Sequence, residues 1–316
     1  MTERQKLLID TDPGVDDALA ILMAYAQPQV EVVALTIAAG NVGLAHTVRN
    51  ALKLLEVIGV DTPVHAGAAW PLVRPADDAA FVHGQDGFGD IGYLPATRDV
   101  EAEHAALAMI RLSHAHAGAL TFVMLGPLTN LALALSLDPG LPQRVKRLVI
   151  MGGAVSGRGN VARIPVEFNT GFDPEAAHIV MSRWPDYELV DWEATLAHGI
   201  PFIESDAWMA AGTPAADFYQ AISRKTRDWM RRTREADRWA AADALAMAVV
   251  VAPDGVQEWA QRPVAIELDG SLTRGATVVD WSQRGGAAAS ARIMMKYDMA
   301  RFSALIRAAL GLNDPA

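Results

Sequence analysis

Four aspartates lie within eight residues near the start of the chain, in the segment DTDPGVDD at positions 10–17. Acidic residues here could simply cap a helix, with Asp12 as the N-cap, Pro13 as the first helical residue, and Asp16 and Asp17 favouring the positive end of the helix dipole. However, two carboxylates about 4 Å apart repel by roughly 4 kcal/mol at an effective dielectric of 20, whereas a helix N-terminus returns only about 0.3–1 kcal/mol per charge. A bound cation would remove this repulsion, and a set of oxygen ligands indicates calcium or magnesium.

The spacing within this segment suggests a division of roles. Asp16 and Asp17 are consecutive, so on a helix their side chains diverge by about 100°, and one can face a metal while the other faces a substrate hydroxyl. Asp12 precedes the rigid Pro13 and can reach the same metal together with a water bound to it. The segment is expected between the first strand and the first helix, at the sheet edge where open α/β folds bind ligands.

Short apolar runs alternate with longer helical patterns along most of the chain. Strands are predicted at residues 6–10, 31–39, 64–66, 120–125, 147–151 and 187–190, helices at 15–26, 44–58 and 102–117, and a glycine-rich loop at 83–92. Later segments add a charged helix at 217–234, an apolar helix at 242–251, and strands at 263–268, 276–281 and 291–296, which could include a hairpin. The pattern predicts an α/β fold with an open, mostly parallel, twisted sheet flanked by helices. No linker divides the chain, so we expect one domain over residues 1–316.

The composition excludes several classes of protein and site. The net charge of −10 and the isoelectric point near 5.2 argue against a nucleic-acid-binding protein, which would need a basic face. The chain has no cysteine, which excludes disulfides, thiolate metal sites and cysteine nucleophiles. It also has no apolar run typical of a signal peptide or long enough to span a membrane. We therefore expect a soluble cytoplasmic protein that binds neither nucleic acid nor membranes.

Several short motifs follow the aspartate segment in order: AGN at 39–41, VHG at 82–84, LGPLTN at 125–130, MGG at 151–153, EFN at 167–169, DPEA at 173–176, and Asp243 before an apolar helix. Together with DTDPGVDDALA, this series resembles the inosine–uridine nucleoside hydrolases, whose N-terminal motif is DxDPGxDD. The resemblance extends from about residue 7 to residue 248. It implies a Rossmann-like nucleoside hydrolase fold, a calcium ion, cleavage of ribonucleosides into ribose and free base in nucleoside metabolism or purine salvage, and a homodimer or homotetramer.

The resemblance also implies roles for individual residues. The calcium ligands would be Asp12, Asp17, Asp243 and the main-chain carbonyl of Leu125, where the side chain has no role. The implied catalytic residues are Asp12 as general base, Asn41 and His83. The residues implied to hold the substrate are Asp16, Asn41 and Asn169 at the ribose 2′- and 3′-hydroxyls, Asn160 and Glu167 at the 5′-hydroxyl, and Met151 and Phe168 around the sugar. Without the resemblance, Asn41 could belong to a turn, Asp243 could cap a helix, Glu167 and Asn169 could be loop polar residues, and Leu125 and Phe168 could be core residues.

The sequence departs from the family pattern at Ala242. Many relatives have a histidine immediately before the late aspartate, where it can protonate the leaving base, and alanine cannot deliver a proton. His83 is a candidate substitute, although a loop histidine is usually only solvated. Trp239 is a predicted substrate-binding residue that could activate a purine base by stacking, in place of a histidine acid. Trp229 lies in the preceding helical region, and both tryptophans could also be packing residues.

Two other function classes remain open from the sequence. A haloacid-dehalogenase-type phosphatase also has a DxD motif at a strand end, but the continuation Pro13-Gly14-Val15-Asp16-Asp17 is not typical of it. A homologue that binds calcium and ribose without catalysis is compatible with the missing histidine. The sequence does not predict the preferred nucleobase.

Overall fold

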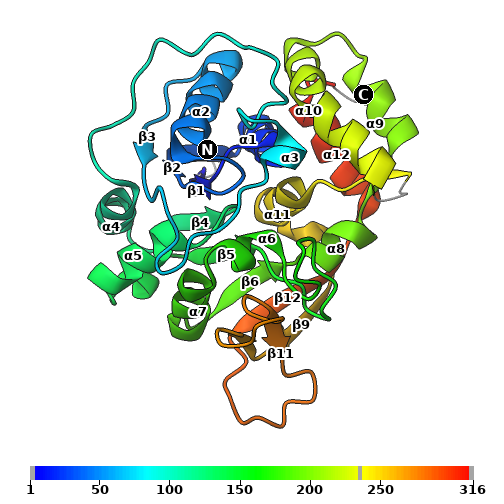
Figure 1. The fold of residues 1–316 in the computed structure, drawn as a ribbon. Coiled ribbons are helices and arrows are strands. Elements are labelled where there is room, and N and C mark those ends of the chain that lie inside the picture. Colours follow the sequence, from blue (N-terminus) through cyan, green and yellow to red (C-terminus); the bar gives the residue numbers. More distant parts are fainter. Residues whose placement is uncertain (1–3, 234–236, 313–316) are drawn as a thin grey trace.

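The computed structural model describes residues 4–233 and 237–312, which are built around an eight-stranded sheet (Figure 1). The strand order is β3-β2-β1-β4-β5-β6-β12-β9, and every neighbouring pair is parallel except β12 with β9. The strands are β1 (Gln5–Thr11), β2 (Val30–Ile37), β3 (Val64–Ala66), β4 (Leu120–Met124), β5 (Arg147–Met151), β6 (Tyr187–Val190), β9 (Val256–Arg262) and β12 (Ala291–Tyr297). The predicted open, mostly parallel α/β sheet is therefore confirmed.

Helices cover both faces of this sheet, because successive strand residues point to opposite sides. In β1, Leu7 and Ile9 belong to one core, whereas Leu8 belongs to a second core. The helices of the first core include α1 (Val15–Tyr25), α2 (Leu44–Ile58), α8 (Trp192–Ala197), α11 (Ala242–Val251) and α12 (Met299–Ala309). Those of the second core are α4 (Ala105–Ala115), α5 (Thr129–Leu137) and α7 (Pro174–Arg183). Burial on both faces explains why the central strands are almost continuously apolar in sequence.

The chain topology creates a crevice at the carboxyl ends of the strands. From β1 the chain passes through α1 to β2 and on to β3, and it then returns to β4 on the opposite side of β1. The segments that follow β1 and β4 therefore diverge, which is where ligands bind in open α/β folds. Asp12 directly follows β1 and Leu125 directly follows β4, and the two segments are joined by a 2.8 Å hydrogen bond from the Leu125 N–H to the Asp10 carbonyl.

Further elements complete the described part of the chain. They are α3 (Ala80–His83), α6 (Phe168–Phe172), α9 (Phe202–Met209), α10 (Pro214–Thr233), the short pair β7 (Ile200–Pro201) and β8 (Arg238–Trp239), the hairpin β10 (Val264–Ile266) and β11 (Thr277–Val279), and 3-10 turns at Leu141–Gln143 and Pro253–Gly255. Figure 1 shows α9 and α10 beside α12, away from β3 and β4, while the hairpin extends beyond the sheet at the other end of the molecule.

Several predicted elements have the observed bounds, namely the helices at 44–58 and 242–251 and the strands at 64–66, 147–151 and 187–190. The hairpin is β10–β11, whereas β12 joins the main sheet. The prediction missed β9 and the helices α9 and α12, and it was wrong about His83, which ends the short helix α3 instead of beginning a loop. The charged helix begins earlier, at Pro214, and Arg234, its predicted last residue, lies outside the described residues. No helix in the described part of the chain is long and apolar enough to cross a membrane.

Candidate active site

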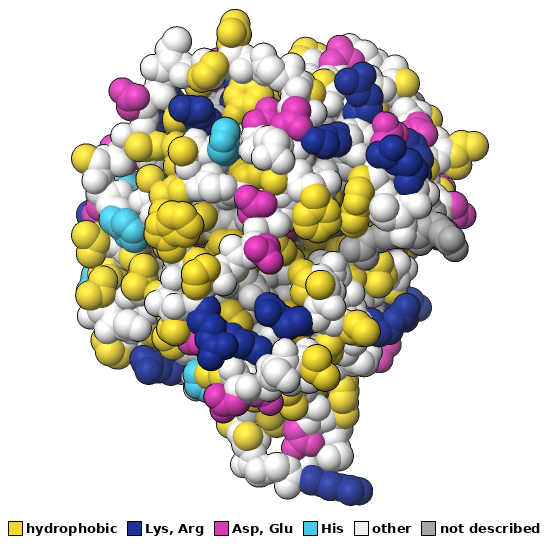
Figure 2. Space-filling model, viewed as in Figure 1, with side chains coloured by type: hydrophobic (Ala, Val, Ile, Leu, Met, Phe, Trp, Pro, Cys, Tyr) yellow, Lys and Arg dark blue, Asp and Glu magenta, His cyan; other side chains and the backbone are white. Residues whose placement is uncertain are grey.

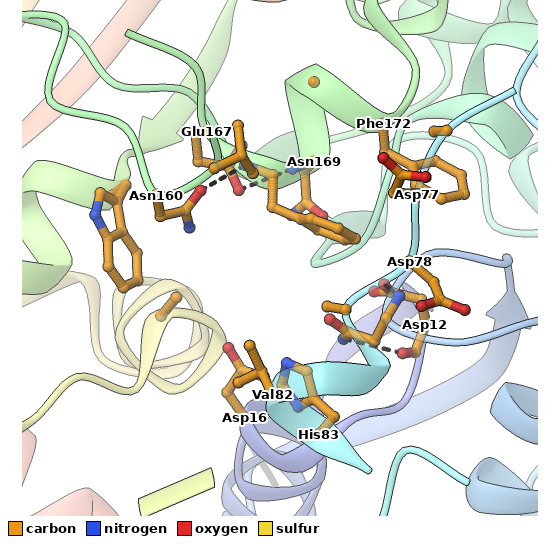
Figure 3. Close-up of a pocket in the computed structure, with 18 of the residues that line it drawn as sticks. Asp12, Asp16, Asp77, Asp78, Val82, His83, Asn160, Glu167, Asn169 and Phe172 are labelled. Carbon is orange, nitrogen blue, oxygen red and sulfur yellow. Dashed lines mark hydrogen bonds between the residues drawn. The ribbon is translucent and has the colours of Figure 1, made fainter. Parts of the chain in front are cut away.

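A cavity of about 510 Å³ opens at the carboxyl ends of β1, β4 and β5. All of the predicted site residues line it except Asp17, which is fully buried behind its wall: Asp12, Asp16, Asn41, His83, Leu125, Met151, Asn160, Glu167, Phe168, Asn169, Trp239 and Asp243. Figure 3 shows that Asp16 and His83 approach the open space from one side, and Glu167, Asn160 and Asn169 from the other. Residues that are far apart in the sequence therefore meet around one cavity.

The mouth of the cavity carries charges of both signs. Asp77 and Asp78 line it from the segment before α3, and Arg74 and Arg163 line it as well; all four are exposed. Figure 2 shows this face of the molecule, with acidic side chains near its centre and basic side chains below them. The deeper part of the cavity is different, because its charged groups are almost all carboxylates.

The Asp12 carboxylate is closely packed at the base of the cavity. Only 1% of its surface is exposed, and its Oδ2 accepts a 2.6 Å hydrogen bond from the Asn41 N–H (Figure 3). Gly40 and Gly126 flank the carboxylate, and a Cβ on either would lie 2.1 Å and 2.5 Å, respectively, from an Asp12 carboxylate oxygen. Burial raises the pKa of Asp12 well above its ordinary value, the charge of Asp17 raises it further, and the Asn41 hydrogen bond only partly opposes this.

The close approach of Gly126 to the Asp12 carboxylate leads to a steric prediction. Gly126→Ala is expected to displace the Asp12 carboxylate, and because a misplacement of about 1 Å can cost about 10²-fold, turnover should fall by about that factor. Gly43→Ala is the matched control, since a Cβ there meets nothing within 4 Å, and it should retain near-parental turnover. Initial rates of both folded variants test this. Equal rates would show that close packing of Asp12 against Gly126 is not required for turnover.

Three further carboxylates form a group that could hold a cation. Oxygen atoms of Asp16, Asp17 and Asp243 all lie within 4.8 Å of one another, and Asp16 Oδ1 is buried with no hydrogen-bond partner among the described residues. Burial raises the pKa of Asp243 well above its ordinary value, and the neighbouring charges of Asp16, Asp17 and Asp12 raise it further. The group includes the predicted ligands Asp17 and Asp243, but its third member is Asp16 instead of Asp12. The first turn of α1 thus brings both of its aspartates to the same place, despite the divergence expected for consecutive helical residues.

Two asparagine side chains donate hydrogen bonds at the base of the cavity. The Asn41 amide donates to Asp17 Oδ2 at 2.9 Å and to the Asp12 carbonyl at 3.2 Å. The Asn169 amide donates to the Leu125 carbonyl at 2.7 Å and to the Met151 carbonyl at 3.3 Å. The Leu125 carbonyl, predicted from the resemblance to be a ligand, therefore does face the cavity.

The opposite wall is built around Glu167, the N-cap of α6. Its carboxylate accepts hydrogen bonds from the N–H groups of Asn169 at 2.9 Å, Thr170 at 3.2 Å and Gly153 at 2.8 Å. Burial nevertheless raises the pKa of Glu167 to about 7. Asn160 Oδ1 accepts from the Phe168 N–H at 2.8 Å, which fixes the long loop before α6 against the cavity.

Asp10, the first aspartate of the segment, has a different role from the other three. Its side chain is completely buried outside the cavity, and its Oδ2 accepts hydrogen bonds from Thr36 Oγ1 at 2.7 Å and from the Asn130 amide at 2.9 Å. Asn130 Oδ1 in turn accepts from the Ala68 N–H at 2.8 Å. Asp10 and Asn130 therefore join β1, β2 and the start of α5 beneath the site.

His83 is not the solvated loop residue that its sequence context suggests. It is 8% exposed, and its Nδ1 accepts a 3.2 Å hydrogen bond from the Val15 N–H at the start of α1. Burial lowers the pKa of His83 to about 4, with the nearby Asp17 charge opposing this shift.

An apolar, largely aromatic wall faces the position of Ala242. Trp239 is 1% exposed and its ring lies 5.7 Å from that of Tyr219, whereas Phe81 and Trp229 form an edge-to-face pair at 5.8 Å. The other members of this wall include Val82, Trp192, Met230 and Ala240. Trp229 and Trp239 were candidates from the sequence. No local pattern identifies Phe81, Trp192 or Met230, because they come from three different helical segments or their flanks.

Comparisons with known proteins agree over nearly the whole chain. The family model described as "Inosine-uridine preferring nucleoside hydrolase" matches residues 7–304. The chain is 35% identical to the inosine-uridine preferring nucleoside hydrolase of Leishmania major, covering 98% of this chain and 99% of that relative. Among solved structures, an inosine-guanosine nucleoside hydrolase has a TM-score of 0.90 at 32% identity, with 98% and 99% of the two chains covered. A purine-preferring ribonucleoside hydrolase from Gardnerella vaginalis has a TM-score of 0.89 at 28% identity, with 96% and 98% covered.

Proposed function

Because the chain belongs to the inosine-uridine preferring nucleoside hydrolase family, and is thus a nucleosidase, we propose that it splits ribonucleosides by a calcium-dependent attack of water on C1′. The observation that carries this proposal is the set of buried carboxylates of Asp12, Asp16, Asp17 and Asp243 at the base of a cavity of about 510 Å³. The family membership leaves the phosphatase alternative without support.

The donor groups fit a calcium ion. They are carboxylates and a carbonyl, the chain has no cysteine, and the raised pKa values of Asp12 and Asp243 indicate carboxylates that lack a compensating positive charge. Asp12, Asp17, Asp243 and the Leu125 carbonyl would hold the ion, with Asp16 beside them. When bound, such an ion would polarise a water molecule and make it easier for a base to deprotonate.

The protein groups would then carry out the reaction as follows. Asp12 takes a proton from the attacking water. The Asn41 N–H and the two flanking glycines hold the Asp12 carboxylate in position for this step. As the water oxygen bonds to C1′, the C1′–N bond breaks and its electron pair passes to the base nitrogen. Positive charge develops on the ribose during this step, and the carboxylates of Asp12 and Asp16 stabilise it.

The remaining polar groups of the cavity would orient the ribose. Asp16, Asn41 and Asn169 are proposed to hold the 2′- and 3′-hydroxyls, and Glu167 and Asn160 the 5′-hydroxyl, with Met151 and Phe168 against the sugar. Asn41 already donates to Asp17 and to the Asp12 carbonyl, and Asn169 donates to the Leu125 carbonyl, so a sugar held by the two asparagines is fixed relative to these groups.

The aromatic wall supports a prediction about the base. Ala242 cannot protonate a leaving base, and we propose that stacking in the compartment of Phe81, Trp229 and Trp239 activates it instead. A purine offers a larger face than a pyrimidine, so inosine turnover is expected to exceed uridine turnover by on the order of tenfold or more. A uridine rate equal to or above that of inosine would reject stacking as the means of activation.

The experiment that tests the function is a panel of nucleosides assayed for free ribose, with and without a calcium chelator. We expect ribose from at least one ribonucleoside, and its loss on chelation. Binding of a ribose analogue with no free base from any nucleoside would instead support a non-catalytic homologue.

A further inference from the structure

His83 lies where three elements of the site meet. It ends α3, its ring contacts the N-terminus of α1, and α10 holds the preceding residue through a 3.0 Å hydrogen bond from Thr226 Oγ1 to the Val82 carbonyl. The His83 carbonyl also accepts a 2.7 Å hydrogen bond from the Gly89 N–H. Hydrogen bonds to the backbone of residues 82 and 83 and to the ring itself therefore hold His83 in place.

One ring nitrogen is committed to the protein. The Val15 N–H donates to Nδ1 at 3.2 Å, and Val15 is the first residue of α1, whose N-terminal N–H groups have no partner within the helix. Gly14, the N-cap, has no side chain to satisfy them, and a Cβ at Gly14 would lie 2.8 Å from His83 Nδ1. The absence of a side chain at Gly14 leaves room for the His83 ring. His83 accepts the hydrogen bond that a capping side chain at position 14 would otherwise accept.

This hydrogen bond determines which nitrogen carries the proton. A backbone N–H can only donate, so Nδ1 must present its lone pair, and a neutral ring then carries its hydrogen on Nε2. The positive end of the α1 dipole and the burial of the ring both disfavour the imidazolium. Consistent with this, burial lowers the pKa of His83 to about 4, although Asp17 opposes it.

The other nitrogen is free to act on a ligand. His83 lines the cavity, and among the described residues no protein group accepts a hydrogen bond from its Nε2. Figure 3 shows the His83 ring next to Asp16 and Val82 at the edge of the open space. A neutral imidazole whose second nitrogen is fixed at a helix N-terminus can serve as a hydrogen-bond donor to a reacting molecule.

We propose that the α1 N-terminus holds His83 as its neutral Nε2–H tautomer, and that this N–H donates a hydrogen bond to an acceptor atom of the bound nucleoside. The proposal rests on the proposed function for its substrate, but the tautomer does not depend on it. His83 then orients or polarises the nucleoside, and it does not replace the missing histidine at position 242 as a cationic acid.

The tautomer can be measured directly in the intact protein. In ¹⁵N-histidine-labelled protein at pH 7, with His83 assigned by loss of its signals in His83→Gln, Nδ1 should show the shift of a lone-pair nitrogen and Nε2 that of a protonated one. Protonation of both nitrogens, or of Nδ1 alone, would overturn the proposal. This result is independent of turnover, so a protein without nucleosidase activity would refute the proposed function and still leave the tautomer to be judged.

Two amide substitutions separate the functions of the two nitrogens. In His83→Asn the shorter side chain can still accept from the Val15 N–H but cannot reach the position of Nε2, so thermal stability should be kept while turnover falls by about tenfold to hundredfold. In His83→Gln the amide can reach the Nε2 position but the cap is lost, so stability should fall while turnover exceeds that of His83→Asn. Turnover in His83→Asn equal to or above that of His83→Gln would overturn the donor role.

The acceptor could be the ribose 5′ oxygen or an atom of the base. With 5′-deoxyinosine, parental protein and His83→Asn should have equal rates if the acceptor is the 5′ oxygen. If the acceptor is on the base, the ratio seen with inosine should persist. Equal rates therefore identify the 5′ oxygen as the acceptor, whereas a persisting ratio excludes it.

Discussion

Asp12→Ala is expected to lower turnover of inosine by about 10³-fold, within the 10²- to 10⁴-fold range of a general base, while the protein remains folded. The fold should tolerate the change, because the buried Asp12 carboxyl has a raised pKa and is a costly charge in the absence of a cation. Removing the carboxylate leaves the Asn41 N–H without this acceptor. That change costs less free energy than keeping an uncompensated buried charge.

The matched control is Asp77→Ala. Asp77 lines the same cavity but is exposed at its mouth, so this variant should retain most of the parental turnover. Initial rates with inosine, together with circular dichroism spectra of both variants, test the assignment. Near-normal turnover in Asp12→Ala would contradict its role as the base.

Calcium is expected to stabilise the protein more strongly as the pH rises from about 6 to 8. Burial raises the pKa of Asp16 to about 6, and the pKa values of Asp12 and Asp243 also lie well above their ordinary value. A raised folded-state pKa means that folding favours the protonated carboxyl. In chelator this stability is fully present below the unfolded-state value of about 4 and is lost as the pH rises through the folded-state values. Calcium binds the ionised carboxylates and so offsets the loss where it is greatest.

The measurement is Tm with calcium and with chelator across this pH range. The difference between the two Tm values should widen with pH, and Asp243→Asn should abolish most of the calcium effect. A difference that narrows with rising pH would contradict the assignment of these carboxylates to a cation.

The central strands and their catalytic junction could be predicted from the sequence because their signals are local. The strand 147–151 and the helix 242–251 are apolar except for Arg147 and Asp243, as expected for elements that are mostly buried. The aspartate segment identified the strand–helix junction because four carboxylates within eight residues exceed what a helix cap requires. The family resemblance then supplied partners from distant segments, and the structure brings those residues to one cavity.

The features that were missed depend on contacts between distant segments. β9 is a partly exposed strand at the sheet edge with the sequence VQEWAQR, whose polar residues protect the edge and remove the alternation that would have identified it. The burial of His83 results from its contact with α1, and the structural role of Asp10 from its bonds to Thr36 and Asn130. The need for glycine at position 126 follows only from the approach of Asp12. None of these contacts leaves a periodic pattern.

The central claim is that this chain adds water to C1′ of a ribonucleoside, and a product balance tests it most directly. Purified protein should be incubated with inosine and calcium in phosphate-free buffer, and inosine, hypoxanthine and ribose quantified over time. The account predicts that hypoxanthine and ribose appear in equal amounts and at equal rates. Bound inosine that remains intact, or base release that requires added phosphate, would contradict it.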